Sequence, residues 1–173
     1  MNHLSKIEDL SKEELLELLK IYAKNWLAHD GLWFQSIEQK RGIDEAIFHD
    51  VNAWEHFTQI EARRIKEFLS LPETPGLDGL QQALNFRLQA TLTKPVYEHP
   101  DERTLLLKTT VCRVQFARRR KNMDDFPCKP VGEKEYSLFA STIDHRIQTE
   151  CISCPPDVTQ PEYGCVWQFT LSP

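Results

Sequence analysis

The chain has 173 residues, of which 40% are hydrophobic and 27% are charged, a composition typical of an ordinary globular protein of one domain. Its net charge of −5 excludes a global basic surface for nucleic acid. No stretch approaches the roughly 18 apolar residues of a membrane span, and the N-terminus lacks the apolar run of a signal peptide, so a cytoplasmic location is expected.

The first 70 residues are expected to be helical. Ser11 and Glu14 have the spacing of a capping box, and apolar residues follow at helical intervals. Asp30-Gly31 is expected to interrupt this first helix, with Asp30 as the cap of a second, shorter helix. The third and longest helix is predicted at about residues 44–69, before a segment rich in Pro and Gly.

The second half of the chain is expected to combine short helices with strands. The predicted helices are residues 80–88, 114–121 and 133–143, and the predicted strands are residues 92–98, 103–112, 148–154 and 165–171. Pro95 makes the first strand an edge strand. This order predicts an α+β fold in which an N-terminal three-helix region packs on a C-terminal antiparallel sheet of about four strands, with two or three further helices.

A single domain over residues 1–173 is expected, with a helical half at about 9–70 and a cysteine-bearing half at about 78–173. The break between the halves resembles a subdomain hinge, but each half is small for an independent domain.

All five cysteines lie in the last third of the chain: Cys112, Cys128, Cys151, Cys154 and Cys165. In a reducing compartment such thiols are free groups, metal ligands or catalytic groups rather than disulfides. Cys151 and Cys154 have the C-x-x-C spacing that supplies two ligands to zinc or iron, although a second such pair is missing. The alternatives are a redox pair and small buried apolar residues.

A catalytic thiol needs a base within reach. Cys112 ends the clearest predicted strand and precedes a helix whose free amides can bind an anion, so it is the candidate nucleophile. His145 is the only histidine after Cys112 and is the candidate base. Asp157, which follows the C-x-x-C segment, completes the candidate catalytic set. The sequence leaves open whether these side chains meet.

Arg113, Gln115 and Arg118 are the candidate ligand-binding residues, because guanidinium groups bind a carboxylate through two parallel hydrogen bonds. The alternative is a solvated basic helix surface, since the run 118–121 is followed by Asp124 and Asp125. The candidate groups are expected to converge in a pocket between the helical half and the sheet.

Several segments spread over nearly the whole chain carry a family resemblance: residues 26–34, 61–65, 112–115 with Arg118, 126–129, 143–144, 146–147 and 151–157, closed by Cys165 and Trp167. Together they resemble a bacterial and archaeal family of unknown function. That family is distantly similar to the L-2-amino-thiazoline-4-carboxylate hydrolase-like proteins, which share a helical N-terminal part and a cysteine-bearing C-terminal part. The distant similarity implies hydrolysis of a small cyclic C–N or C–S compound that bears a carboxylate, and it transfers no catalytic residue.

Two functions therefore stay open. The first is a small-molecule-binding protein, a hydrolase of such a compound if it is an enzyme. The second is a non-catalytic module whose cysteines bind a metal or sense oxidation. The expected partner is a small molecule, with neither nucleic acid nor membrane, and exposed aromatic residues such as Trp33 would allow a homo-oligomer.

Overall fold

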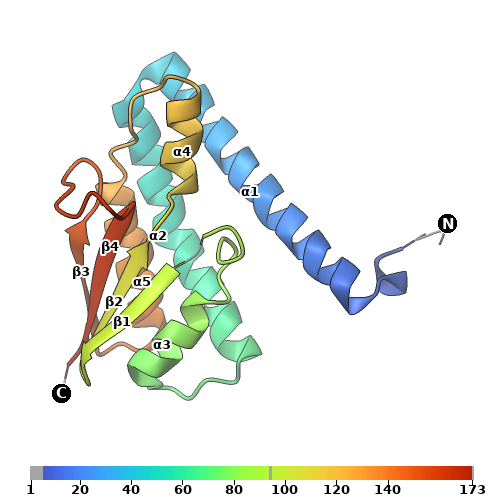
Figure 1. Cartoon of the computed structure of the whole chain (residues 1–173), viewed down its shortest axis with the longest axis vertical. Coiled ribbons are helices and arrows are strands. Elements are labelled where there is room, and N and C mark those ends of the chain that lie inside the picture. The colour runs from blue at the N-terminus through green and yellow to red at the C-terminus, as the bar shows by residue number, and fades with distance from the viewer. Residues whose placement is uncertain (1–5, 94, 173) are drawn as a thin grey trace.

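Two long helices make up the N-terminal part of the fold. The computed structural model describes residues 6–93 and 95–172. A short 3-10 turn, η1 (Ile7–Asp9), precedes α1 (Lys12–Arg41) and α2 (Ile43–Phe68), which run in opposite directions (Figure 1). The predicted capping box is present: the Ser11 hydroxyl accepts from the Glu14 amide at 3.2 Å, and the Glu14 carboxylate accepts from the Ser11 amide at 2.8 Å. Gly42 joins the helices with a φ of 93°, which glycine adopts readily.

The helix break predicted at Asp30-Gly31 was wrong, because α1 runs through both residues. A glycine inside a helix costs about 1 kcal/mol relative to alanine. Packing on either side of Gly31 offsets this cost: Trp26 meets the Trp54 ring of α2 at 5.8 Å, and Phe34 meets the Phe126 ring at 4.7 Å. The region that was expected to hold three helices therefore holds two long ones.

The sheet of the described residues has four antiparallel strands in the order β1-β2-β4-β3: β1 (Pro95–Asp101), β2 (Thr104–Thr109), β3 (Ile147–Ser153) and β4 (Cys165–Leu171). The α+β class, the antiparallel sheet and the edge position of the Pro95 strand are thus confirmed. Leu105 and Leu107 of β2 pair with Phe169 and Trp167 of β4, and all four side chains are buried.

Three shorter helices complete the described fold: α3 (Gly76–Leu84), α4 (Arg113–Arg120) and α5 (Lys129–Ile143). α5 lies between α2 and the sheet (Figure 1). It approaches the sheet closely at Gly132, where a Cβ would lie 2.5 Å from a Trp167 ring carbon, and the Tyr136 ring stacks on Trp167 at 4.7 Å. The layers are therefore the sheet, α5, and the α1–α2 pair.

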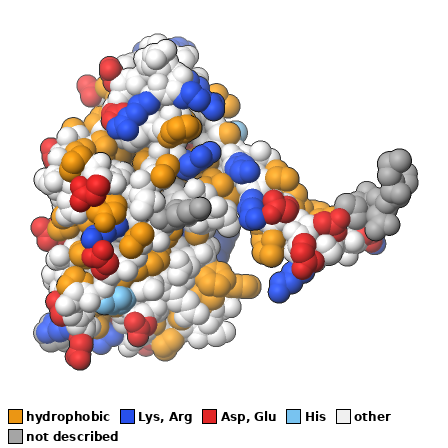
Figure 2. All heavy atoms as spheres, in the orientation of Figure 1, with side chains coloured by type: hydrophobic (Ala, Val, Ile, Leu, Met, Phe, Trp, Pro, Cys, Tyr) orange, Lys and Arg blue, Asp and Glu red, His pale blue; other side chains and the backbone are white. Residues whose placement is uncertain are grey.

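The N-terminal half of α1 extends away from these layers (Figure 1). Within α1, all of which the structure describes, Ala23 is the only buried residue. Figure 2 shows hydrophobic side chains along this arm, and the exposed ones are Leu15, Leu16, Leu19, Ile21 and Tyr22. None of the described helices combines the length and the apolar character that crossing a bilayer requires.

Candidate functional site

A cavity of about 360 Å³ lies between α1, α2, α4, α5 and the sheet. This volume is within the range of about 300–1,000 Å³ that small-molecule sites occupy. Its walls contain aromatic rings, carboxylates and thiols: Trp26, Phe34, Trp54, Phe116, Phe126, Tyr136 and Trp167; Asp30, Asp50 and Glu135; and Cys112, Cys128, Cys154 and Cys165. The expected position of a pocket, between the helical half and the sheet, agrees with this cavity.

Two half-buried aspartates face the cavity without a compensating cation. Asp30 comes from the middle of α1 and Asp50 from α2, and neither forms an ion pair with any residue that the structure describes. Burial raises the pKa of Asp30 to about 6, and the nearby charge of Glu135 adds to the effect. Burial raises the pKa of Asp50 to about 7, aided by Asp30 and Glu135 and opposed by a hydrogen bond from Trp54. The expected role of Asp30 as a helix cap was wrong, since it lies inside α1.

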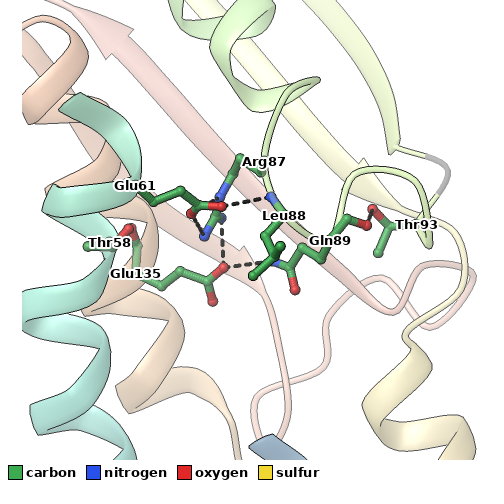
Figure 3. A network of polar contacts seen from close by, with 7 residues as sticks. All are labelled: Thr58, Glu61, Arg87, Leu88, Gln89, Thr93 and Glu135. Atoms are coloured by element: carbon green, nitrogen blue, oxygen red, sulfur yellow. Dashed lines mark hydrogen bonds and ion pairs between the residues drawn. The ribbon is translucent and has the colours of Figure 1, made fainter. Parts of the chain in front are cut away.

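Figure 3 shows a buried ion network, of which Glu135 and Gln89 also line the cavity. The Arg87 guanidinium donates to Glu61 at 3.0 Å and to Glu135 at 2.7 Å. The Leu88 amide donates to Glu61 at 2.7 Å, and the Gln89 amide group donates to Glu135 at 2.9 Å. Burial raises the pKa of Glu135 although Arg87 opposes the shift. The network joins α2 and α5 to the segment that follows α3.

Aromatic rings surround the same guanidinium. The Arg87 Cζ atom lies 4.8 Å from the centre of the Phe139 ring, 5.6 Å from that of Tyr136 and 5.7 Å from that of Trp54. A desolvated cation above such rings is stabilised by about 2 kcal/mol. Aromatic rings and carboxylates of the protein interior therefore stabilise the Arg87 guanidinium together.

Sequence reasoning did not predict a role for Asp50, Glu61 or Glu135. Glu61 is buried. The signal was present in α2, because Asp50 and Glu61 lie four residues before and seven residues after Trp54, on the same face of the helix. Acidic residues on a buried helix face indicate a polar network or a site.

Four of the five thiols line the cavity, and two of them are in contact. The sulfur atoms of Cys128, which precedes α5, and Cys154, which follows β3, are 3.4 Å apart. The Cys154 thiol lowers the pKa of Cys128 by hydrogen bonding to it, and the pKa of Cys154 is raised in turn. Burial raises the pKa of Cys112 and that of Cys165, the latter to about 12. Cys128 is therefore the more readily deprotonated thiol of this pair, while burial disfavours the thiolate forms of Cys112 and Cys165.

The predicted catalytic residues are separated in the structure. Cys112 lines the cavity at the N-terminal end of α4. His145 is exposed beyond the C-terminal end of α5, whose 15 residues span about 22 Å, while Cys128 precedes its N-terminal end. Asp157 is exposed and pairs with Lys129 at 2.7 Å. Among the described residues no histidine lines the cavity, so the structure does not bring a base of this type to Cys112.

The three predicted ligand-binding residues have different surroundings. Arg118 is buried and donates to both carboxylate oxygens of Glu38 at 2.7 and 2.8 Å, so it ties α4 to α1. Gln115 donates to the Phe126 carbonyl at 2.6 Å and accepts from the Phe126 amide at 2.9 Å. Arg113 is exposed at the rim of the cavity. Two of the three therefore hold the protein together, and Arg113 alone of these three is solvent-exposed.

The expected zinc or iron site does not fit the residues present. Burial raises the pKa of Cys151, and its C-x-x-C partner Cys154 is hydrogen-bonded to Cys128. Over residues 6–93 and 95–172, no group of three or more His, Cys, Asp or Glu side chains is arranged to hold a metal ion. A metal site needs three or four such ligands, and the described residues do not bring them together around Cys151 and Cys154.

Comparison with known proteins gives a family and no activity. The family of unknown function DUF6125 matches residues 7–171 of the chain. No protein with a curated description matches it.

Proposed function

The chain belongs to the family of unknown function DUF6125, and we propose that this member binds a small organic molecule in the cavity between its helices and its sheet. A concave, mostly apolar site with a few polar groups is the usual form of a ligand pocket. The observation that carries the proposal is the cavity itself, about 360 Å³ in volume and walled by aromatic rings with the carboxylates of Asp30 and Asp50 among them.

Gly31 gives a second reason, because it lines the cavity from inside α1, where glycine weakens a helix. A Cβ at Gly31 would meet no atom within 4 Å. This glycine therefore leaves room that the fold itself does not use.

The test compares two substitutions at Gly31. A library of neutral, cationic and anionic fragments is screened on the full chain by ligand-observed NMR. Gly31→Ala should stabilise α1 and keep the hits, whereas Gly31→Phe should place a ring in the free space and weaken them by about tenfold or more. Fragments that bind both variants equally well, or the absence of any hit on the wild type, would overturn the proposal.

Hydrolysis of a carboxylate-bearing cyclic compound stays a prediction. The cavity offers the Cys112 thiol at a helix N-terminus, but burial raises its pKa and no described histidine lines the cavity. Arg118, expected to bind the carboxylate, is paired with Glu38. The geometry therefore favours binding over hydrolysis.

Thiol sensing is the second candidate, favoured by the 3.4 Å separation of the Cys128 and Cys154 sulfurs. A peroxide would oxidise the Cys128 thiolate to a sulfenic acid, and attack by the Cys154 sulfur would release water and leave a disulfide. In sum, two thiols and one hydrogen peroxide give one disulfide and two waters. Mass spectrometry of peroxide-treated protein should show a 128–154 crosslink, and Cys154→Ser should leave the sulfenic acid. Oxidation confined to other cysteines would exclude this role.

A further inference from the structure

The charges around Trp54 are not balanced within the protein. Four carboxylates lie in this region, and two of them, Glu61 and Glu135, are held by Arg87 at distances of 2.7 to 3.0 Å. The other two, Asp30 and Asp50, line the cavity and form no ion pair with the described residues, although the adjacent His29 imidazole lowers the pKa of Asp30 slightly against the effect of burial. A buried carboxylate is stable in its charged form only when it is paired. When Asp30 and Asp50 are ionised, their negative charge therefore lies on the cavity wall without an ion pair among the described residues.

Each of these two aspartates shares a helix face with a tryptophan. Asp30 follows Trp26 by four residues in α1, and Asp50 precedes Trp54 by four residues in α2, a spacing that places side chains next to each other. All four side chains line the cavity, and the two indole rings meet edge to face with centroids 5.8 Å apart. Carboxylates beside aromatic rings provide the two interactions that bind an organic ammonium group.

The other charged residues of the cavity wall do not cancel this negative charge. They are Glu135 on α5, Lys24 on α1, and Arg113, Arg118 and Arg120 on α4. Glu135 is held by Arg87 and Arg118 by Glu38, while Lys24, Arg113 and Arg120 are exposed side chains with no ion pair to either aspartate. The position beside Asp30 and Asp50 therefore remains available to a cation from outside the protein.

We infer that the ligand of the cavity is an organic amine, whose ammonium group binds to the carboxylates of Asp30 and Asp50 and whose apolar part lies against Trp26 and Trp54. This inference rests on the proposed function and adds the chemical class of the ligand. Arg87 shows the same chemistry inside the fold, with carboxylates and rings around one cation.

The experiment uses three probes of one shape and different charge on the full chain: phenethylamine, 2-phenylethanol and 3-phenylpropanoate. Calorimetry at about pH 8, where both aspartates are ionised, should show the amine binding at least about tenfold more tightly than the alcohol, and the carboxylate binding least. The affinity for the amine should fall as the pH is lowered to about 5, because both carboxylates then take up protons.

Isosteric variants locate the effect. Asp30→Asn and Asp50→Asn should each weaken amine binding by about tenfold and change alcohol binding much less. Asp44→Asn, which changes an exposed acidic residue in the first turn of α2, is the matched control and should bind the amine like the wild type. Circular dichroism of each variant confirms that it is folded.

The outcomes distinguish a failure of the amine inference from a failure of the proposed ligand-binding function. If the alcohol binds as tightly as the amine and the two asparagine variants bind the amine like the wild type, the inference of an amine ligand is wrong. The proposal that the cavity binds a small molecule, a neutral one, is then retained. If the carboxylate binds most tightly, the inference is overturned in favour of an anion at the arginines of α4. If none of the three binds, the inference fails, and the fragment screen with the Gly31 variants decides the proposed function independently.

Discussion

At the scale of single residues, the buried Asp144 and the half-buried Asp50 have opposite effects on stability. Asp144 accepts hydrogen bonds from the Gly76 amide at 2.9 Å and from the Arg146 guanidinium at 2.8 and 3.0 Å, which hold its pKa below the ordinary value. Asp144 therefore adds to the free energy of unfolding above its unfolded pKa, and this stabilisation is lost as the pH falls toward its lowered folded pKa. Asp50 has no cation partner among the described residues, and burial raises its pKa to about 7. It favours folding only while it is protonated.

The Asp50→Asn variant should be more stable than the wild type at high pH. Between the unfolded pKa of 3.8 and the folded pKa of about 7, the native protein holds a proton that the unfolded chain has released, so the free energy of unfolding falls as the pH rises through this window. We expect a gain of about 1 kcal/mol, or about 2–4 °C in Tm, at about pH 8 and none at about pH 4, because solvent screens a partly buried group. Calorimetry that finds the wild type more stable at high pH would contradict this.

At the scale of helices and strands, the sequence predicted the features that depend on interactions between residues close together in the chain. The capping box at Ser11 and the alternation in β2 depend on residues close in sequence, and both are observed. The helix through Gly31 was not predicted, because contacts with α2 and with Phe126, far along the chain, override the local preference. The Arg87 network was missed for the same reason, since its partners lie 26 and 48 residues away.

Removing Arg87 should test how strongly the network joins α2, α5 and the segment after α3. Arg87→Ala leaves Glu61 and Glu135 facing each other in a buried site, and the loss of one partner of such an ion pair costs about 3–5 kcal/mol. Arg64→Ala, at an exposed position of α2, should cost less than about 0.5 kcal/mol. Urea denaturation measures both, and a similar loss for the two variants would show that the network adds little.

At the scale of the whole molecule, the site joins residues whose proximity only the fold determines. Cys112 and Cys154 both line the cavity, whereas Cys151 and Asp157, which were expected in the same site, do not. The pairing with His145 could not be judged from sequence, because it depends on which end of α5 each segment occupies. The homo-oligomer also stays a prediction, and the exposed arm of α1 gives it a measurable consequence.

The arm of α1 should exchange its amide hydrogens much faster than the rest of the helix if the chain is a monomer. A helical segment of fewer than about 12–15 residues without tertiary contacts is marginally stable in water. We therefore expect low protection for residues 12–22 and high protection for residues 30–41, measured by hydrogen exchange with mass spectrometry. Equal protection in both parts would contradict a monomer, and light scattering would then report a second copy.

Three of the four tryptophans of the chain, Trp26, Trp54 and Trp167, border the cavity, and the fourth, Trp33, is 67% exposed. The intrinsic tryptophan fluorescence therefore reports mainly on the interior of the protein. A water-soluble quencher can selectively suppress the emission of the exposed Trp33. A ligand that alters the polarity beside the indoles will change the wavelength and intensity of the tryptophan emission. Natural extracts can therefore be screened without a label, before the ligand is known.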